Sequence, residues 1–170
     1  MEQGKQHQRL SSGEKRVWVD YDLLIDKAKS EAAPSNPLKE SLFRLFNDNH
    51  QWRFHASCAD IDQTSGKRIM LVKCFDRAIE SEEAIAEMDQ LGYRPAIHLE
   101  LYAFVKNRSK IKYASGIIAF GSCSHGRDSH DPFPVTFVRI TCDIDGLIMT
   151  ETWLLGRRWL SDNHFLFVRK

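Results

Sequence analysis

The sequence predicts an α+β domain with a mixed or antiparallel sheet and two to three helices. Three observations favour this class. Short segments rich in β-branched and aromatic residues alternate in polarity, two segments with apolar residues at helical spacing follow each other directly, and the C-terminal half is rich in hairpin signals. Because helices and strands do not alternate regularly along the chain, a doubly wound parallel sheet is disfavoured.

Composition indicates one globular unit. The chain has 170 residues, of which 42% are hydrophobic, and this is enough for one domain with its own core. The formal net charge is +1, so no overall basic field predicts binding to nucleic acid. Residues 1–14 are polar and predict a flexible tail before a single domain over residues 15–170. We expect a cytoplasmic protein, because no segment has the character of a secretory signal or the length of a membrane span.

Five features are expected in the N-terminal half. Residues 16–21 are rich in β-favouring residues and predict a strand, and Asn36 followed by Pro37 predicts the start of a helix that ends near residue 49. A half-buried strand is expected at residues 52–58, because polar and apolar residues alternate there. Residues 60–67 indicate a hairpin loop, and the apolar run 69–72 indicates a central strand.

Two helices and several hairpins are expected in the C-terminal half. Ser81 is a capping residue for a helix that ends at Gly92, residues 93–95 form a connector, and a second helix covers residues 97–105. Asp143 to Gly146 is typical of a tight hairpin turn. Four further strands are predicted, at residues 115–121, 138–142, 147–154 and 165–169.

Five segments resemble, in order, motifs of a group of small bacterial proteins. Residues 91–104 (LGYRPAIHLELYAF) resemble the motif G-x-R-P-A-T-x-x-E-L-L-A-F. The other four resemble V-D-Y-D, I-S-S-E-x-A-I-x-E-L, I-V-A-L-G-S and R-F-L-A-V-R-K, and they lie at residues 19–22, 79–88, 117–122 and 164–170.

Residues 77–170 are also similar to the C-type-lectin-like fold of formylglycine-generating enzymes, through a G-Y-R-L-P-T-E-A-E-W-E helix entry and a terminal G-F-R-L-V-R strand. The resemblance implies that the last strand pairs into the main sheet and that the loops before it form a binding surface. In some proteins of this fold, diversity-generating retroelements randomise that surface. The reactive cysteine pair of those enzymes has no counterpart here, so the resemblance does not imply their oxidase activity.

The leading functional prediction is therefore non-catalytic binding of a protein or small-molecule ligand, with no cofactor, through the segment 150–164. Within this segment, residues that alternate with Ile148, Trp153, Phe165 and Phe167 are expected to point outward. The predicted contact residues are Thr150, Thr152, Arg157, Arg158, Asp162, Asn163 and His164.

Trp153 and Trp159 flank Arg157 and Arg158, and this pattern leaves three interpretations open. The four residues can clamp a single-stranded nucleic acid or anchor a protein ligand. Alternatively, both tryptophans belong to the core and the arginines lie at the tip of a hairpin.

A rival prediction is a metal- or thiol-dependent enzyme built on residues 123–131. Cys123, His125 and His130 are residue types that zinc binds, and Cys142 is a candidate fourth ligand. The alternative is a polar loop that happens to be rich in histidine. A catalytic thiolate at Cys123 requires an electropositive setting, which sequence alone does not show.

Other polar residues have simpler explanations. Asp143 and Asp145 can bind calcium or act as an acid–base pair, but turn geometry explains them as well. His98 and Glu100 are expected to form a surface pair on a helix. Arg94 is expected to hold loop carbonyls through its guanidinium group.

Overall fold

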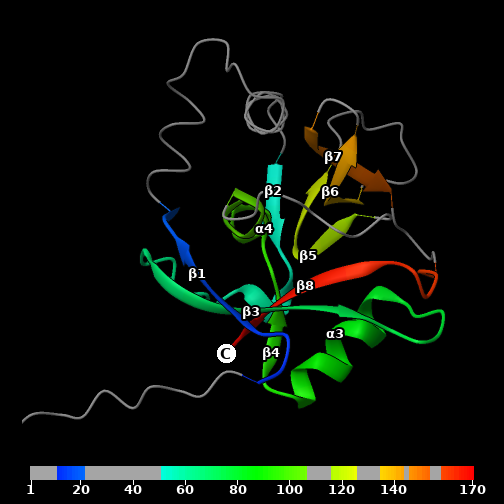
Figure 1. Ribbon diagram of the computed structural model, residues 1–170, viewed down its shortest axis with the longest axis horizontal. Helices are drawn as coiled ribbons and strands as arrows, with labels where there is room; N and C mark the ends of the chain where they lie inside the picture. Colours follow the sequence, from blue (N-terminus) through cyan, green and yellow to red (C-terminus); the bar gives the residue numbers. More distant parts are fainter. Residues whose placement is uncertain (1–10, 22–50, 107–115, 126–134, 144–145, 154–157) are drawn as a thin grey trace, which may run out of the picture.

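The described part of the chain forms an eight-stranded sheet with an α-helix on each face (Figure 1). The computed structural model describes residues 11–21, 51–106, 116–125, 135–143, 146–153 and 158–170. The elements in chain order are β1 (Lys15–Val19), β2 (Gln51–Phe54), the 3₁₀ helix η1 (Ala56–Cys58), β3 (Gly66–Cys74), α3 (Ser81–Gln90), β4 (Tyr93–Pro95), α4 (His98–Lys106), β5 (Ile117–His125), β6 (Val135–Asp143), β7 (Gly146–Trp153) and β8 (His164–Arg169). The α+β class is confirmed.

The sheet is mixed, although most of its pairs are antiparallel. Its main order is β1-β3-β8-β5-β6-β7, while β2 pairs with β5 and β4 pairs with β8. Only β5 and β8 run parallel among the described pairs, through Ile117↔His164 and Ile118↔Phe165. The pairing of Asp143 with Gly146 closes the β6–β7 hairpin where the sequence predicts a turn. Among the helices that the structure describes, none is long and apolar enough to cross a membrane.

Strand β8 lies in the middle of the sheet and is buried on both faces. Phe165 and Phe167 face the core that α3 covers, whereas Leu166 and Val168 face the core that α4 covers. The expectation of outward-pointing residues concerns the segment 150–164, and in this strand it covers only His164, which is half-buried. Helices cover both faces of β8, so the alternation of its other residues does not separate core from solvent. Each such side chain contributes about 1.5–3 kcal/mol through burial.

Helix α3 is attached to the sheet by Trp159. The expected capping role of Ser81 is not observed, because its hydroxyl instead accepts a hydrogen bond from the indole Nε1 of Trp159 at 2.9 Å. The backbones of Ile79 and Trp159 also pair. The Trp159 ring packs against Phe165 at 5.5 Å between centroids and is 5% exposed. Trp159 is thus a core residue and is not available to stack on a nucleobase. Gly92 ends the helical segment at φ +81°, as predicted.

Residues 93–95 form a strand, which corrects the expected connector. Tyr93 pairs with Arg169 and Pro95 pairs with Phe167, so β4 shares one edge of β8 with β5. Three residues ending in proline give too short a pattern to indicate a strand. The residues from His98 to Val105 in the following helix α4 are all buried. His98 and Glu100 therefore do not form a surface pair.

Two other expectations change in the described residues. The strand expected at residues 52–58 ends at Phe54, and the chain then turns through η1. Glu14, placed in the predicted tail, is 3% exposed and packs against the sheet. The helix expected up to residue 49 lies outside the described residues.

A β-bulge in β5 brings three segments together. The register with β6 shifts between Ala119 and Cys123. Within the bulge, the N–H of Gly121 donates to the carbonyl of Ala96 at 2.8 Å. A Cβ at Gly121 would lie 2.7 Å from the carbonyl oxygens of Pro95 and Ala96. Only glycine allows this approach of two backbones.

Gly121→Ala should therefore destabilise the protein. Backbone atoms have to shift to relieve the contact, and overpacking of this kind costs about 1–3 kcal/mol. The measurement is the free energy of unfolding in urea. Gly66→Ala is the matched control, because a Cβ in that strand meets its nearest neighbour, an Arg68 side-chain atom, at 3.4 Å. Equal effects of both substitutions would contradict the close-approach explanation.

His98 predicts a pH dependence of stability. Burial lowers the pKa of its imidazole to about 3, and its backbone N–H and Nδ1 both contact the hydroxyl of buried Ser122. The unfolded chain takes up a proton near pH 6.5 whereas the folded protein does not. Stability is therefore full above pH 6.5 and falls by up to about 1.4 kcal/mol per pH unit as the pH drops toward 3. In urea titrations between pH 7 and pH 5, His98→Asn should flatten this slope, whatever its effect at pH 7. An unchanged slope would contradict the assignment.

Candidate functional site

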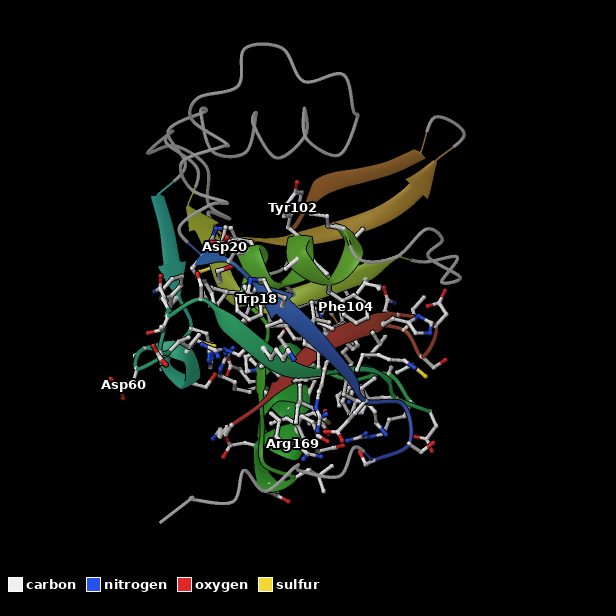
Figure 2. All side chains as sticks on the ribbon, turned by 60° about the vertical axis from the view of Figure 1, so that its left-hand side comes forward. Trp18, Asp20, Asp60, Tyr102, Phe104 and Arg169 are labelled. Atoms are coloured by element: carbon white, nitrogen blue, oxygen red, sulfur yellow. The ribbon has the colours of Figure 1, made fainter. Side chains whose placement is uncertain are left out.

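A pocket of about 480 Å³ lies beside η1, where β3, β4 and the end of β8 meet. We call it the basic pocket, because five of its lining residues are basic and two are acidic. Asp60 follows η1 and lies at the edge of the molecule in Figure 2, and Arg169 is the last residue of β8. The lining residues are Ala56, Ser57, Asp60, Ile61, Asp62, Lys67, Arg68, Ile69, Arg94, Arg169 and Lys170.

Arg94 is held by a buried ion pair with Glu100. Two hydrogen bonds of 2.8 and 2.6 Å join its guanidinium to the carboxylate, which is fully buried. Desolvation opposes the charge on Arg94, but the hydrogen bonds and charge of Glu100 outweigh it and raise the pKa of the guanidinium. Glu100 also accepts from Tyr21 Oη at 2.6 Å and from the N–H of Ile97 at 2.9 Å. It thereby caps the start of α4 as well.

Arg94 contacts a backbone carbonyl, as expected, but this carbonyl belongs to strand β4 and not to a loop. Its Nη1 donates to the carbonyl of Pro95 at 3.2 Å, in addition to the stronger pair with Glu100. Sequence reasoning identified Arg94 as a structural residue but missed its acidic partner. The two residues lie six positions apart, in different elements.

Arg169 and Lys170 are also paired with carboxylates. Arg169 contacts Glu14, and Lys170 contacts Asp89. Desolvation opposes ionisation of Glu14, but hydrogen bonds from Tyr93 and Ser11 and the charge of Arg169 outweigh it and lower its pKa to about 2. These pairs neutralise part of the positive charge around the pocket.

Lys67 and Arg68 are the lining cations that form no hydrogen bond to a carboxylate among the described residues, although Arg68 also lies over the ring of Tyr21. Arg68 donates to the carbonyls of Asp62 and Thr64 at 2.8 Å each, and these acceptors are neutral. The Asp62 carboxylate lies 3.9 Å from the guanidinium, which is longer than a hydrogen bond. The exposed ammonium group of Lys67 has no partner among the residues that the structure describes.

Ser57, at the pocket wall, contacts a histidine that contacts a carboxylate. The Oγ of Ser57 lies 2.7 Å from Nδ1 of His55, and Nε2 of His55 lies 3.1 Å from Oε1 of Glu82. The N–H of Ser57 donates to the same Nδ1 at 3.1 Å. A serine, an imidazole and a carboxylate therefore form a chain of contacts beside the pocket.

The short helix that carries Ser57 is anchored at both ends. The N–H of His55 donates to the carbonyl of Gly121 in the β5 bulge at 3.1 Å, and the thiol of Cys58 donates to the carbonyl of Pro95 at 3.3 Å. Burial raises the pKa of the Cys58 thiol, so this cysteine is a structural donor rather than a reactive thiolate.

The residues predicted to bind ligand at 150–164 are only partly described. Thr150 and Thr152 lie on β7, of which only the backbone is described, and Arg157 lies outside the described residues. Arg158 and Asp162 are exposed, while Asn163 and His164 are half-buried just before or at the start of β8. None of these residues lines the basic pocket. A binding surface at this segment remains a prediction.

The strand register limits which residues can form the rival metal site. Cys123 and His125 lie in β5 rather than in the expected loop, and His130 and Asp145 lie outside the described residues. Cys123 pairs with Phe137, five residues along β6 from Cys142, a distance of about 17 Å. Cys142 therefore cannot share a metal ion with Cys123. Among the described residues, no group of three or more His, Cys, Asp or Glu side chains is arranged to hold a metal.

No protein-family model matches the chain, no curated protein matches it significantly, and no solved structure matches its fold significantly. The resemblance to small bacterial proteins and the C-type-lectin-like assignment of residues 77–170 therefore stay predictions. A function can therefore be inferred only from the residues of the site described above.

Sequence reasoning missed the basic pocket and the Ser57 contacts. The residues that line the basic pocket come from four separate parts of the chain, and no sequence pattern predicts that they come together. One local signal for the Ser57 contacts is present in the sequence. His55 lies two residues before Ser57, and a side chain at this spacing can accept from a backbone N–H at the start of a helix.

Glu100→Gln should strongly destabilise the protein. It removes the charge that compensates buried Arg94, and breaking one partner of a buried pair costs about 3–5 kcal/mol. The measurement is the free energy of unfolding in urea. Glu83→Gln is the control, because Glu83 pairs with Arg77 at the surface and its loss should change stability little. Similar losses in the two variants would contradict the distinction between buried and exposed pairs.

Proposed function

We propose that the protein binds a small organic anion in the basic pocket. The observation that carries this proposal is the pair of lining cations, Lys67 and Arg68, that lack a carboxylate within hydrogen-bond distance in the described structure. A guanidinium and an ammonium that line the same pocket suit a carboxylate or phosphate group, because hydrogen bonds between charged groups are stronger than those between neutral groups.

The size and walls of the pocket support an organic ligand rather than a bare ion. Its volume of about 480 Å³ falls within the range of small-molecule sites. Ile61 and Ile69 add apolar surface to the wall, where the carbon part of a ligand can pack. The proposal keeps the expected class, a ligand-binding protein, and assigns the ligand to a site outside the segment 150–164.

The pocket is also preorganised. Arg94 and Arg169 are fixed by Glu100 and Glu14, so two walls of the pocket are in place before a ligand arrives. Binding then costs mainly the ordering of Lys67 and a rearrangement around Arg68.

The test is isothermal titration calorimetry with phenyl phosphate at fixed ionic strength, with benzyl alcohol as the neutral comparison. Arg68→Ala should weaken phenyl phosphate binding about tenfold or more, because a charged hydrogen bond contributes about 1.5–3 kcal/mol. Lys67→Ala should also weaken it, without loss of the contacts that Arg68 makes to the 62–64 backbone.

Lys73→Ala is the matched control. It removes the same charge from the same strand but lies outside the pocket. Phenyl phosphate should bind this variant as it binds the unmodified protein. Equal weakening by Lys73→Ala and Lys67→Ala would indicate nonspecific attraction, and no saturable binding at all would refute the proposal.

A further inference from the structure

The contacts of His55 fix which of its nitrogens carries the proton. A backbone N–H can only donate, and the N–H of Ser57 points at Nδ1 at 3.1 Å, so Nδ1 carries the lone pair. The proton of the neutral ring is then on Nε2, where the Glu82 carboxylate accepts it at 3.1 and 3.2 Å. The Ser57 hydroxyl, 2.7 Å from the same Nδ1, is left as the donor.

This is the arrangement that activates a serine nucleophile. The nitrogen that bears the lone pair of the base contacts the hydroxyl as well as the N–H of Ser57, and a third group on the other nitrogen orients the base. The His55 side chain is 23% exposed, whereas that of Glu82 is 78% exposed. His55 is thus partly shielded, and Glu82 acts as a positioning residue.

We infer that Ser57 is a nucleophile that hydrolyses carboxylic esters whose acyl chain carries a negative charge. Ser57 lines the basic pocket, which would hold the charged end of the acyl chain. The preference for an anionic substrate rests on the proposed function, whereas the reactivity of Ser57 does not. The positive charge of the pocket also favours the oxyanion that forms during attack.

The reaction needs only the ester and water. The Oγ of Ser57 bonds to the carbonyl carbon while its proton passes to Nδ1 of His55. The bond from that carbon to the alcohol oxygen breaks, and the alcohol leaves with the proton from His55. Water then attacks the acyl group by the same route, which releases the carboxylic acid and restores the Ser57 hydroxyl.

The first experiment is labelling with a fluorophosphonate probe, followed by peptide mass spectrometry. In this reaction the Oγ of Ser57 bonds to phosphorus, fluoride leaves and the proton goes to His55. We expect one label per chain, on Ser57, and its loss in Ser57→Ala. Ser161→Ala is the control, because Ser161 is an exposed serine outside the pocket and its loss should leave labelling unchanged.

His55→Asn separates a catalytic from a structural role. Asparagine is a good capping residue and can still accept from the N–H of Ser57, so η1 should keep its form. It cannot take the hydroxyl proton. The labelling rate should therefore fall at least a hundredfold, in line with the contribution of a general base. A retained rate would show that His55 serves only as a cap and would overturn the inference.

The second experiment compares hydrolysis of 4-nitrophenyl hydrogen succinate with that of neutral 4-nitrophenyl butyrate. Ser57→Ala should abolish turnover of both esters and still bind phenyl phosphate. Lys67→Ala should raise KM for the succinate ester alone. Labelling of Ser57 without phenyl phosphate binding would refute the proposed function but would still support Ser57 as the nucleophile. Phenyl phosphate binding without labelling of Ser57 would refute the nucleophile alone.

Discussion

The burial of β8 on both faces is the constraint on which the rest of the structure depends. Four consecutive apolar residues, 165–168, supply side chains to two separate cores. Each core then needs its own helix, and α3 and α4 occupy opposite faces for this reason. Because β4 and β5 share one edge of β8, their backbones meet at Gly121, where no side chain fits. The close approach at Gly121 in turn holds the turn that carries His55 and Ser57.

The candidate site and the buried polar network are one connected structure. The carbonyl of Pro95 accepts from the thiol of Cys58 and from the guanidinium of Arg94. The first bond fixes the helix that carries Ser57, and the second fixes a wall of the basic pocket. Glu100 extends the same network to the start of α4. A buried polar network that is fully hydrogen-bonded specifies one arrangement, so the short helix with Ser57 and the guanidinium of Arg94 keep a constant relation to each other.

The sequence was informative where a local pattern determines the structure. The apolar run 69–72 indicated the central strand β3, Gly92 indicated the end of α3, and Asp143 to Gly146 indicated a hairpin. The sequence did not predict the position of a residue when that position depends on a partner far away in the chain. The helical spacing of Ile97, Leu101 and Phe104 predicts that His98 faces solvent, yet the bulge in β5 covers it. The pocket could not be predicted from the sequence, because Arg68, Arg94 and Arg169 come together only through the pairing of β3 and β4 with β8.

The position of β8 along the chain has a kinetic consequence. The strand in the middle of the sheet is the last of the described strands in chain order, and its partners β3, β4 and β5 precede it by many residues. Neither core can close while residues 164–168 are still to be synthesised, and contacts between residues far apart in sequence form slowly. The apolar faces of α3 and α4 thus stay open to solvent and to chaperones until residues 164–168 have been synthesised.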